Sequence, residues 1–469
     1  MHDLRSLTEQ GRHWRSQWHT AENQTGIDRG SRRQFLGQSG AAAALLTGLS
    51  HAARAQPKAV GQVRSVIMIF NCGGPSHIDL WDPKPAASDT VRGPFQPIDT
   101  NVSGIQVTEL LPRMARMTDK LAILRSVNHT QASHNAGMYY TTVGRPYRVD
   151  STLINPTSAD HPCLGTLVGW LARRDGYSSG LPPYVIAPYP HCDSNVYLTP
   201  GQFGGCLGMQ YDPLVLDADP NAADFKVRNL KLDASLTADK FRERLGLLGQ
   251  VNRQGHSITS PTAADLDIYQ SQAMQMVSSD KAAKAFDLSE EPVEVRNRYG
   301  RNTWGQSHLL ARRLVEAGVK FVSAVNGRSI IWDTHKDNFG RMQKDLVPKM
   351  EQAYATLLED LDARGLLDTT LVIWTGDFGR TPMINKDAGR DHWPQCYSVV
   401  MAGGGIRGGQ VVGQSDSIGG HPHSRPISPA DINATVFSML GYEPNNISYK
   451  MNDGRPIPLS EGQPIREIL

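Results

Sequence analysis

Short apolar runs rich in β-branched residues recur along the chain, and the clearest are apolar on both faces. Such strands suit a parallel sheet that is covered on both sides by helices. Helical patterns separate the later runs, most clearly at 346–361, where apolar residues recur every three or four positions. We therefore predict an α/β fold, a three-layer sandwich with a mostly parallel central sheet. The predicted strands are 63–70, 121–127, 184–187, 320–325, 370–375 and 397–402, with further helices at 305–317 and 428–440.

Charge and cysteine content exclude several classes of protein. The 469 residues include 48 basic and 46 acidic ones, a net charge of +2, so a nucleic-acid partner is not expected. No stretch is long and apolar enough to predict a stable transmembrane segment in the mature chain. The five cysteines include no CxxC pair, so we predict neither a disulfide framework nor a cysteine-based zinc site.

The first residues have the three parts of a twin-arginine export signal. Arg32 and Arg33 precede a small-residue apolar run at 41–49, and Ala53-Arg54-Ala55 matches an A-x-A cleavage site. We predict that residues 1–55 are a signal peptide and that 56–469 form the mature domain. The twin-arginine export machinery would then be a partner, and the protein would be periplasmic or extracellular.

Residues 190–300 interrupt the alternation of strands and helices. The segment is rich in glycine at 199–209 and polar further on. We predict a cap-like insertion over one end of the sheet.

Polar side chains follow nearly every predicted strand. Ligands of open α/β sheets bind beyond the carboxyl ends of the strands, so these side chains are expected to converge. Carboxylates and imidazoles together suit a divalent metal ion: zinc, manganese or iron, or calcium if carboxylates dominate. A metal there would bind an oxygen of an ester, and the forked donors of Arg380 and Arg390 would hold an anionic group. The predicted metal ligands are Asp79, Asp333, His335, Asp377 and His392.

Two residues that follow the strand predicted at 121–127 carry a catalytic alternative. The hydroxyl of Ser133 is a candidate nucleophile that His134 or a metal would activate, although a metal-bound water would serve as well. Ser133 equally suits the N-cap of a helix that starts near Asn135. A lone Asp after a strand, such as Asp333, is also more often a cap than a ligand, so the prediction depends on recurrence at several strand ends.

Six blocks give the chain a resemblance to the domain of unknown function 1501 family. They are GGPSHIDLWDPKP (73–85), WDTHKDNF (332–339), GDFGRTP (376–382), GRDHW (389–393), AGGGIRGG (402–409) and DGRP (453–456). The family is placed by similarity in the alkaline-phosphatase/sulfatase superfamily. The resemblance implies a metal site, a nucleophile at the start of a helix, and an alkaline-phosphatase-like form of the predicted fold.

The resemblance also identifies departures from the superfamily pattern. SHNAGMYYTTVGRP (133–146) is similar to the sulfatase nucleophile segment and places His134 near the nucleophile, but the C/S-x-P-x-R motif for formylglycine is absent. Phe378 follows Asp377 where the superfamily has His, whereas His392 matches the last His ligand. We therefore keep two hypotheses: an exported hydrolase of sulfate or phosphate esters, on small molecules or polysaccharides, or an inactive protein that binds anionic polymers or envelope partners.

Overall fold

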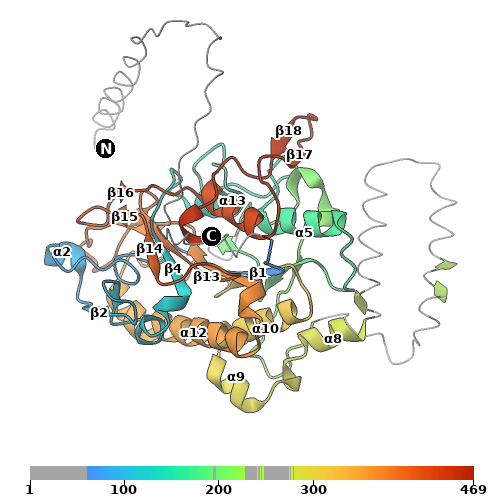
Figure 1. The fold of residues 1–469 in the computed structure, drawn as a ribbon, viewed down its shortest axis with the longest axis horizontal. Coiled ribbons are helices and arrows are strands. Elements are labelled where there is room, and N and C mark those ends of the chain that lie inside the picture. The colour runs from blue at the N-terminus through green and yellow to red at the C-terminus, as the bar shows by residue number, and fades with distance from the viewer. Residues whose placement is uncertain are drawn as a thin grey trace, which may run out of the picture. The chain divides into compact units, whose positions relative to one another are not determined.

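The computed structural model describes residues 61–193, 197–227 and 279–469, together with isolated positions between 240 and 277. An eight-stranded sheet lies at its centre (Figure 1). Its strands are β1 (Ser65–Asn71), β4 (Leu121–Val127), β5 (Tyr184–Ala187), β8 (Leu214–Val215), β9 (Phe321–Val325), β10 (Thr370–Gly376), β13 (Tyr397–Gly403) and β14 (Gln410–Val412). Their order across the sheet is β14-β4-β13-β10-β1-β9-β5-β8.

The strands run in one direction with the exception of β13. β1 pairs in parallel with β10 and β9, and β4 pairs in parallel with β14. β13 lies between β10 and β4 and is antiparallel to both. One edge of the sheet therefore contains the carboxyl ends of β1, β4, β9 and β10 and the amino end of β13. Side chains that follow or precede these strands can form a site at that edge.

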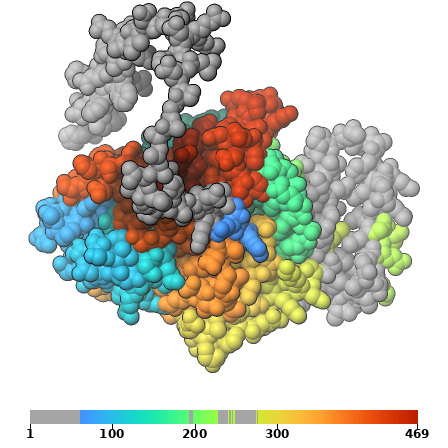
Figure 2. Space-filling model, viewed as in Figure 1, coloured from blue at the N-terminus to red at the C-terminus, as the bar shows by residue number. Residues whose placement is uncertain are grey.

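Helices cover both faces of the sheet, because the side chains of each strand alternate between two cores. On one face, Ile67 and Ile69 of β1 pack in a core that includes α10 (Thr303–Glu316) and α12 (Val347–Ala363). On the other face, Val66 and Met68 share a core with α4, α5 and α13. These three helices span His134–Val143, Leu164–Arg174 and Pro429–Met439. Figure 1 labels α13 and α12 on opposite sides of the sheet, and Figure 2 shows the red surface of the C-terminal part of the chain on the opposite side of the described unit from the orange and yellow surface.

Shorter elements complete the described chain. The short helices are α2 (Asp89–Arg92), α3 (Pro112–Ala115), α8 (Asp280–Phe286), α9 (Val293–Tyr299) and α11 (Asn338–Arg341), and a π-helical turn, Met342–Leu346, leads into α12. Two-stranded pairs join β2 (Pro97–Asp99) to β3 (Gln106–Thr108), β6 (Cys192–Asp193) to β7 (Tyr197–Leu198), β11 (Gly379–Arg380) to β12 (His392–Trp393), β15 (Gln414–Ser415) to β16 (Pro422–Ser424), and β17 (Ser448–Lys450) to β18 (Pro456–Pro458). Turns of 3-10 helix lie at Thr118–Lys120, Gly205–Leu207, Met209–Tyr211, Leu288–Glu290, Leu367–Thr369 and Arg466–Ile468.

The predicted three-layer α/β architecture is confirmed, as are the six predicted strands, with shifts of up to two residues at their ends. The helix predicted at 428–440 is α13, whose first turn is closed by a reciprocal capping box between Ser428 and Asp431. The signal peptide predicted at 1–55 and most of 228–278 in the predicted insertion lie outside the described residues. Among the described helices, none has the length and apolar character needed to cross a membrane.

Candidate metal centre

The carboxylate of Asp333 lies among three imidazole rings at the edge of the sheet where the strand ends meet. Its Oδ1 atom is 3.5 Å from Nε2 of His134, 3.0 Å from Nε2 of His335 and 3.2 Å from Nε2 of His392. The ligand atoms of His134, Asp333 and His392 all lie within 4.8 Å of one another. Tetrahedral bonds to zinc place ligand atoms about 3.3 Å apart. The spacing therefore fits a shared cation.

The topology brings these four side chains together from distant parts of the sequence. His134 is the first residue of α4, shortly after β4, and Asp333 and His335 lie in the loop that follows β9. His392 belongs to β12, just ahead of β13. The antiparallel direction of β13 is what returns His392 to the edge where the parallel strands end.

A hydrogen bond holds the second ring nitrogen of each histidine. Nδ1 of His134 is bonded to Oδ2 of Asp377, Nδ1 of His335 lies 2.6 Å from Oδ1 of Asp391, and Nδ1 of His392 lies 2.7 Å from the Ala132 carbonyl oxygen. A carbonyl oxygen only accepts, so Nδ1 of His392 carries the proton. Carboxylate or carbonyl partners of this kind are what orient metal-binding imidazoles.

These bonds turn the three Nε2 atoms toward Asp333. In a neutral ring protonated on Nδ1, Nε2 carries a lone pair, and a lone pair facing a carboxylate oxygen is repelled unless a cation lies between them. Nε2 of His134 is buried and makes no hydrogen bond within the described structure. The donor set of the described cluster therefore fits a divalent metal ion held by His134, Asp333 and His392. Nε2 of His335 lies 3.0 Å from Nε2 of His392, which makes His335 a fourth candidate ligand.

The charges of the cluster also favour a cation. Burial alone would lower the pKa of His134, but the carboxylates of Asp377 and Asp333 raise it to about 9. Burial works against the charge of Asp333 as well, yet the nearby imidazoles of His134 and His392 and the guanidinium of Arg380 hold the pKa of that carboxyl well below its usual range. Asp333 is therefore ionised, and in the absence of metal a proton on His134 is held between two carboxylates.

Arg380, predicted to hold an anionic group, faces the protein interior. Its side chain is fully buried and donates to Oδ1 of Asp333 at 2.6 Å and to the Gly74 and Arg390 carbonyl oxygens at 2.8 and 3.1 Å. It also donates to the carbonyl oxygens of Gly73 and Trp332. Because its N–H donors are engaged in this way, Arg380 orients Asp333 and does not offer a pair of N–H groups to an anionic ligand.

Asp377, a predicted ligand, contacts the cluster through His134. It follows β10 directly, is fully buried, and accepts a hydrogen bond from the Gly73 backbone N–H through Oδ1 at 2.9 Å. Its other oxygen faces Nδ1 of His134. Both oxygens are occupied, so the structure gives Asp377 the position of a residue that orients His134.

Asp79, also a predicted ligand, is not brought to the cluster. It forms a fully buried two-pronged ion pair with Arg390, with N–O distances of 2.7 and 3.0 Å, and Oδ2 also accepts from Asn338 at 2.9 Å. The remaining donors of Arg390 bond the carbonyl oxygens of Thr381, Pro382 and Val91. The pair braces the loops beneath the site, so the expectation that Arg390 binds an anion is not supported.

Ser133 directly precedes His134, but its hydroxyl is directed elsewhere. The hydroxyl donates to Oδ1 of Asp150 at 2.6 Å, and the same carboxylate accepts from the backbone N–H groups of Ser133 and Ala132, each at 2.8 Å. Burial works against the charge, but these bonds lower the pKa of Asp150. Ser133 occupies the N-cap position of α4 without a side-chain capping bond. The structure therefore fully supports neither the predicted nucleophile nor the predicted N-cap.

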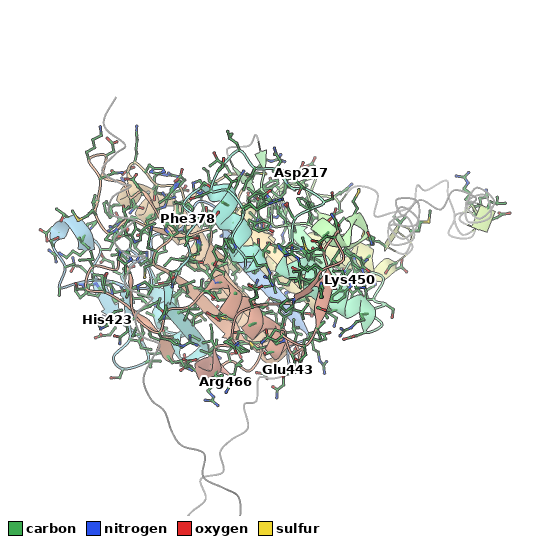
Figure 3. The ribbon with its side chains drawn as sticks, turned by 90° about the horizontal axis from the view of Figure 1, so that it is seen from above. Asp217, Phe378, His423, Glu443, Lys450 and Arg466 are labelled. Carbon is green, nitrogen blue, oxygen red and sulfur yellow. The ribbon has the colours of Figure 1, made fainter. Side chains whose placement is uncertain are left out.

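Phe378 packs against the imidazoles. Its ring centroid lies 5.0 Å from that of His134 and 4.6 Å from that of His392, and Figure 3 labels it beside the sheet. The resemblance noted in the sequence implies a histidine at this position, and the structure has an apolar ring there. Among the described residues, one group of His and Asp side chains has the spacing of a metal site.

From the sequence, His134 was assigned to catalysis, Asp391 was not made a ligand or an orienting residue, and Asp150 was not singled out. The GRDHW block did contain Asp391 beside His392, but its contact with His335 depends on a loop closure that spacing does not show. Asp150 stands in a polar loop with no motif around it, so no sequence signal pointed to it.

Several solved structures resemble the chain. A protein in the alkaline phosphatase superfamily from Vibrio parahaemolyticus is 9% identical with a TM-score of 0.37, covering 82% of this chain and 68% of that one. A sulfatase from Pseudoalteromonas sp. is 13% identical with a TM-score of 0.35, covering 81% and 68%. A phosphonate monoester hydrolase from Silicibacter pomeroyi is 13% identical with a TM-score of 0.35, covering 86% and 76%.

The family comparison covers the whole predicted mature domain except its first few residues. No curated protein matches the chain. A family model described as protein of unknown function (DUF1501) matches residues 63–469, the stretch that carries the sheet and the cluster around Asp333. The chain therefore belongs to the DUF1501 family.

Proposed function

We propose that the protein is a metal-dependent hydrolase of sulfate or phosphate esters, with its cation held by His134, Asp333, His335 and His392. The observation that carries the proposal is the orientation of the rings: three Nε2 atoms face one carboxylate oxygen, and an acceptor fixes each Nδ1 atom. When bound, a divalent cation supplies Lewis-acid chemistry, polarising an ester oxygen and lowering the pKa of water.

The donor set narrows the identity of the metal. Imidazole nitrogens with one carboxylate suit zinc, manganese or iron. Calcium takes six to eight oxygen ligands in general, so calcium, which the sequence left open, is the least suited of the predicted metals. We propose zinc or manganese.

The surrounding residues support hydrolysis by positioning the candidate ligands and by placing apolar surface against them. Arg380 and Asp377 hold Asp333 and His134 in place, and Phe378 covers the imidazoles with an apolar ring. The loop of Ala132 and Ser133 is held by Asp150, and the Ala132 carbonyl in turn accepts from His392. A rigid, partly dry site strengthens the interaction of fixed charges with the charge that develops on an ester oxygen.

One observation favours the alternative, a protein that binds anionic polymers or envelope partners without catalysis. The Ser133 hydroxyl is bonded to Asp150, so it is not aimed at the cluster, and the sulfatase nucleophile motif is absent. Hydrolysis through activated water needs no such hydroxyl, so we prefer the hydrolase.

Metal content and activity of three variants test the proposal. We expect His392→Ala to weaken metal binding by about tenfold or more and to remove hydrolysis of aryl sulfates or phosphates. Ser133→Ala should keep the metal, and it should lose activity only if the hydroxyl is the nucleophile. His423→Ala, an exposed histidine on β16, is the matched control and should change neither property. Full metal content in His392→Ala, measured by elemental analysis, would contradict the ligand assignment.

We also propose that the protein is exported by the twin-arginine route to the periplasm or beyond. The support is the sequence at 1–55, with its arginine pair, apolar run and cleavage site.

A further inference from the structure

A pocket of about 260 Å³ lies apart from the metal centre. Tyr139 of α4 lines it, together with 146–148, which follow that helix. The other walls are 159–161, ahead of α5, and Met451 and Arg455 at the turn between β17 and β18, which Figure 1 shows near α5. His134 begins α4, whose ten residues span about 15 Å, so the pocket lies toward the far end of the helix from the cluster.

Hydrogen bonds fix the walls of the pocket to one another. The side chain of Asn452, at the hairpin turn, donates to the Ser158 carbonyl oxygen at 2.9 Å. The His161 backbone N–H donates to the Tyr139 hydroxyl at 3.1 Å, and His161 Nδ1 lies 2.7 Å from the Tyr449 hydroxyl. The walls therefore come from three segments that are tied together, and the pocket is preformed.

The charge that lines the pocket is positive. Arg148 and Arg455 contribute guanidinium groups, and both residues are exposed. Nε of Arg455 also lies 3.7 Å from the exposed carboxylate of Asp453, which is outside the lining, so an anion would compete with that solvent-screened contact. Asp160 is the one acid among the lining residues, but it is buried and its two oxygens accept from the Thr157 backbone N–H and hydroxyl, both at 2.9 Å. Burial, and then the field of Arg145, Arg455 and Arg148, lowers the pKa of His161 to about 4, so that ring is uncharged at neutral pH.

Aromatic side chains form another part of the lining. The rings of Tyr139 and Tyr147 meet edge to face, with centroids 4.8 Å apart. Aromatic rings present apolar surface beside a hydroxyl, so they contact the mixed surface of a sugar ring well. Guanidinium forks match the oxygens of sulfate or carboxylate. The volume is somewhat below that of pockets for drug-sized ligands, which suits a single ring.

We propose that this pocket binds one anionic sugar unit, whose sulfate or carboxylate is held by Arg148 and Arg455. It is a binding subsite separate from the metal centre, and the proposal does not rest on the proposed hydrolysis. On a polymer, such a subsite would hold one charged unit while another reaches the sheet edge.

Three sugars with the same ring test the pocket in the full chain by titration calorimetry: galactose 6-sulfate, galacturonic acid and galactose. They carry a sulfate, a carboxylate and a hydroxyl at the same position. We expect at least one charged sugar to bind about tenfold or more tightly than galactose, and the stronger of the two identifies the preferred anion. Equal binding of all three sugars, or no binding of either charged one, would overturn the proposal.

Two sets of variants distinguish the effect of the arginine charges on sugar binding from the effect of the space in the pocket. Arg148→Ala with Arg455→Ala should weaken the charged sugar about tenfold or more, whereas Ala159→Trp should fill the pocket and remove binding without a change of charge. Arg298→Ala, on α9, which Figure 1 shows on the other side of the described unit from β17 and β18, is the matched arginine control and should bind normally. Undiminished binding by the double variant would refute the site. His392→Ala should retain sugar binding, so a failure of the metal centre is distinguishable from a failure of the pocket.

Discussion

At the scale of single residues, one oxygen atom organises the candidate metal centre. Oδ1 of Asp333 has four nitrogen neighbours: one from Arg380 at 2.6 Å and three imidazole Nε2 atoms at 3.0 to 3.5 Å. An oxygen with two lone pairs does not accept four separate hydrogen bonds well. Arg380 takes one position, and a cation shared among the rings would account for the others. The crowding around Asp333 is therefore the residue-level reason for proposing a metal.

Residue roles were only partly predictable from the sequence. Asp79, Asp333 and Asp377 all follow strands, and nothing in their local sequence separates a ligand from a brace. Asp79 pairs with Arg390 and Asp377 with His134, and both partners are more than two hundred positions away in the chain. The recurrence of Asp and His at strand ends located the site, whereas the role of each residue depends on long-range contacts.

Our prediction for Asp377 follows from its two acceptors. Oδ1 accepts from the Gly73 N–H and Oδ2 from Nδ1 of His134. Asp377→Asn leaves one acceptor for these two donors, so the amide NH₂ must oppose one of them and the Nδ1-protonated form of His134 loses its support. We expect a 10–100-fold loss of metal affinity.

Competition with a chelator of known affinity measures that loss. Asp387→Asn, an exposed position in the loop between β11 and β12, is the matched control and should leave metal affinity unchanged. Equal metal affinity in Asp377→Asn and the unsubstituted protein would show that Asp377 does not orient His134.

At the scale of elements, length decided what could be predicted. Long strands such as β1 and β10 are apolar throughout, so the sequence predicts them. The strands β8 (Leu214–Val215) and β14 (Gln410–Val412) are too short to show a period, and they were missed. Helix α4 carries His134 but has little amphipathic character, since all its residues except Tyr140 are buried. Its position depends on close contact with the end of β10.

We predict that Gly137→Ala disturbs that contact. A Cβ atom at 137 would lie 2.9 Å from Cδ1 of Phe378 and 3.1 Å from the Asp377 carbonyl oxygen. The backbone oxygen gives way only if α4 moves, and the movement would draw His134 from Asp377. Overpacking of this kind costs about 1–3 kcal/mol of unfolding free energy, despite the higher helix propensity of Ala.

Denaturant unfolding and metal titration check the two consequences. Gly169→Ala in α5 is the matched control, because its nearest neighbour is Cγ of Pro183 at 3.3 Å, the edge of a flexible ring. It should change the unfolding free energy by less than about 1 kcal/mol and leave metal affinity unchanged. A Gly137→Ala protein with unaltered stability and metal binding would show that α4 tolerates the extra methyl.

At the scale of the whole molecule, the proposed metal ligands exist as a set only after folding. They come from loops around β4, β9, β10 and β13, and the sheet is what brings them to one edge. A binding site that is absent from the unfolded chain couples metal uptake to folding. The twin-arginine route carries folded proteins, so a chain that uses it can acquire its metal before it crosses the membrane.

The last prediction concerns that route, and the residues involved lie outside the described part of the chain. Replacing Arg32 and Arg33 by Lys keeps both positive charges, so it tests the arginine pair and not the charge of the segment. We expect precursor to remain in the cytoplasm, folded and with metal bound. Arg29→Lys, an arginine outside the pair, is the matched control and should be exported normally. Cell fractionation followed by immunoblotting distinguishes the variants. Accumulation of the double variant outside the cytoplasm, equal to that of the Arg29→Lys protein, would mean that residues 1–55 do not act as a twin-arginine signal.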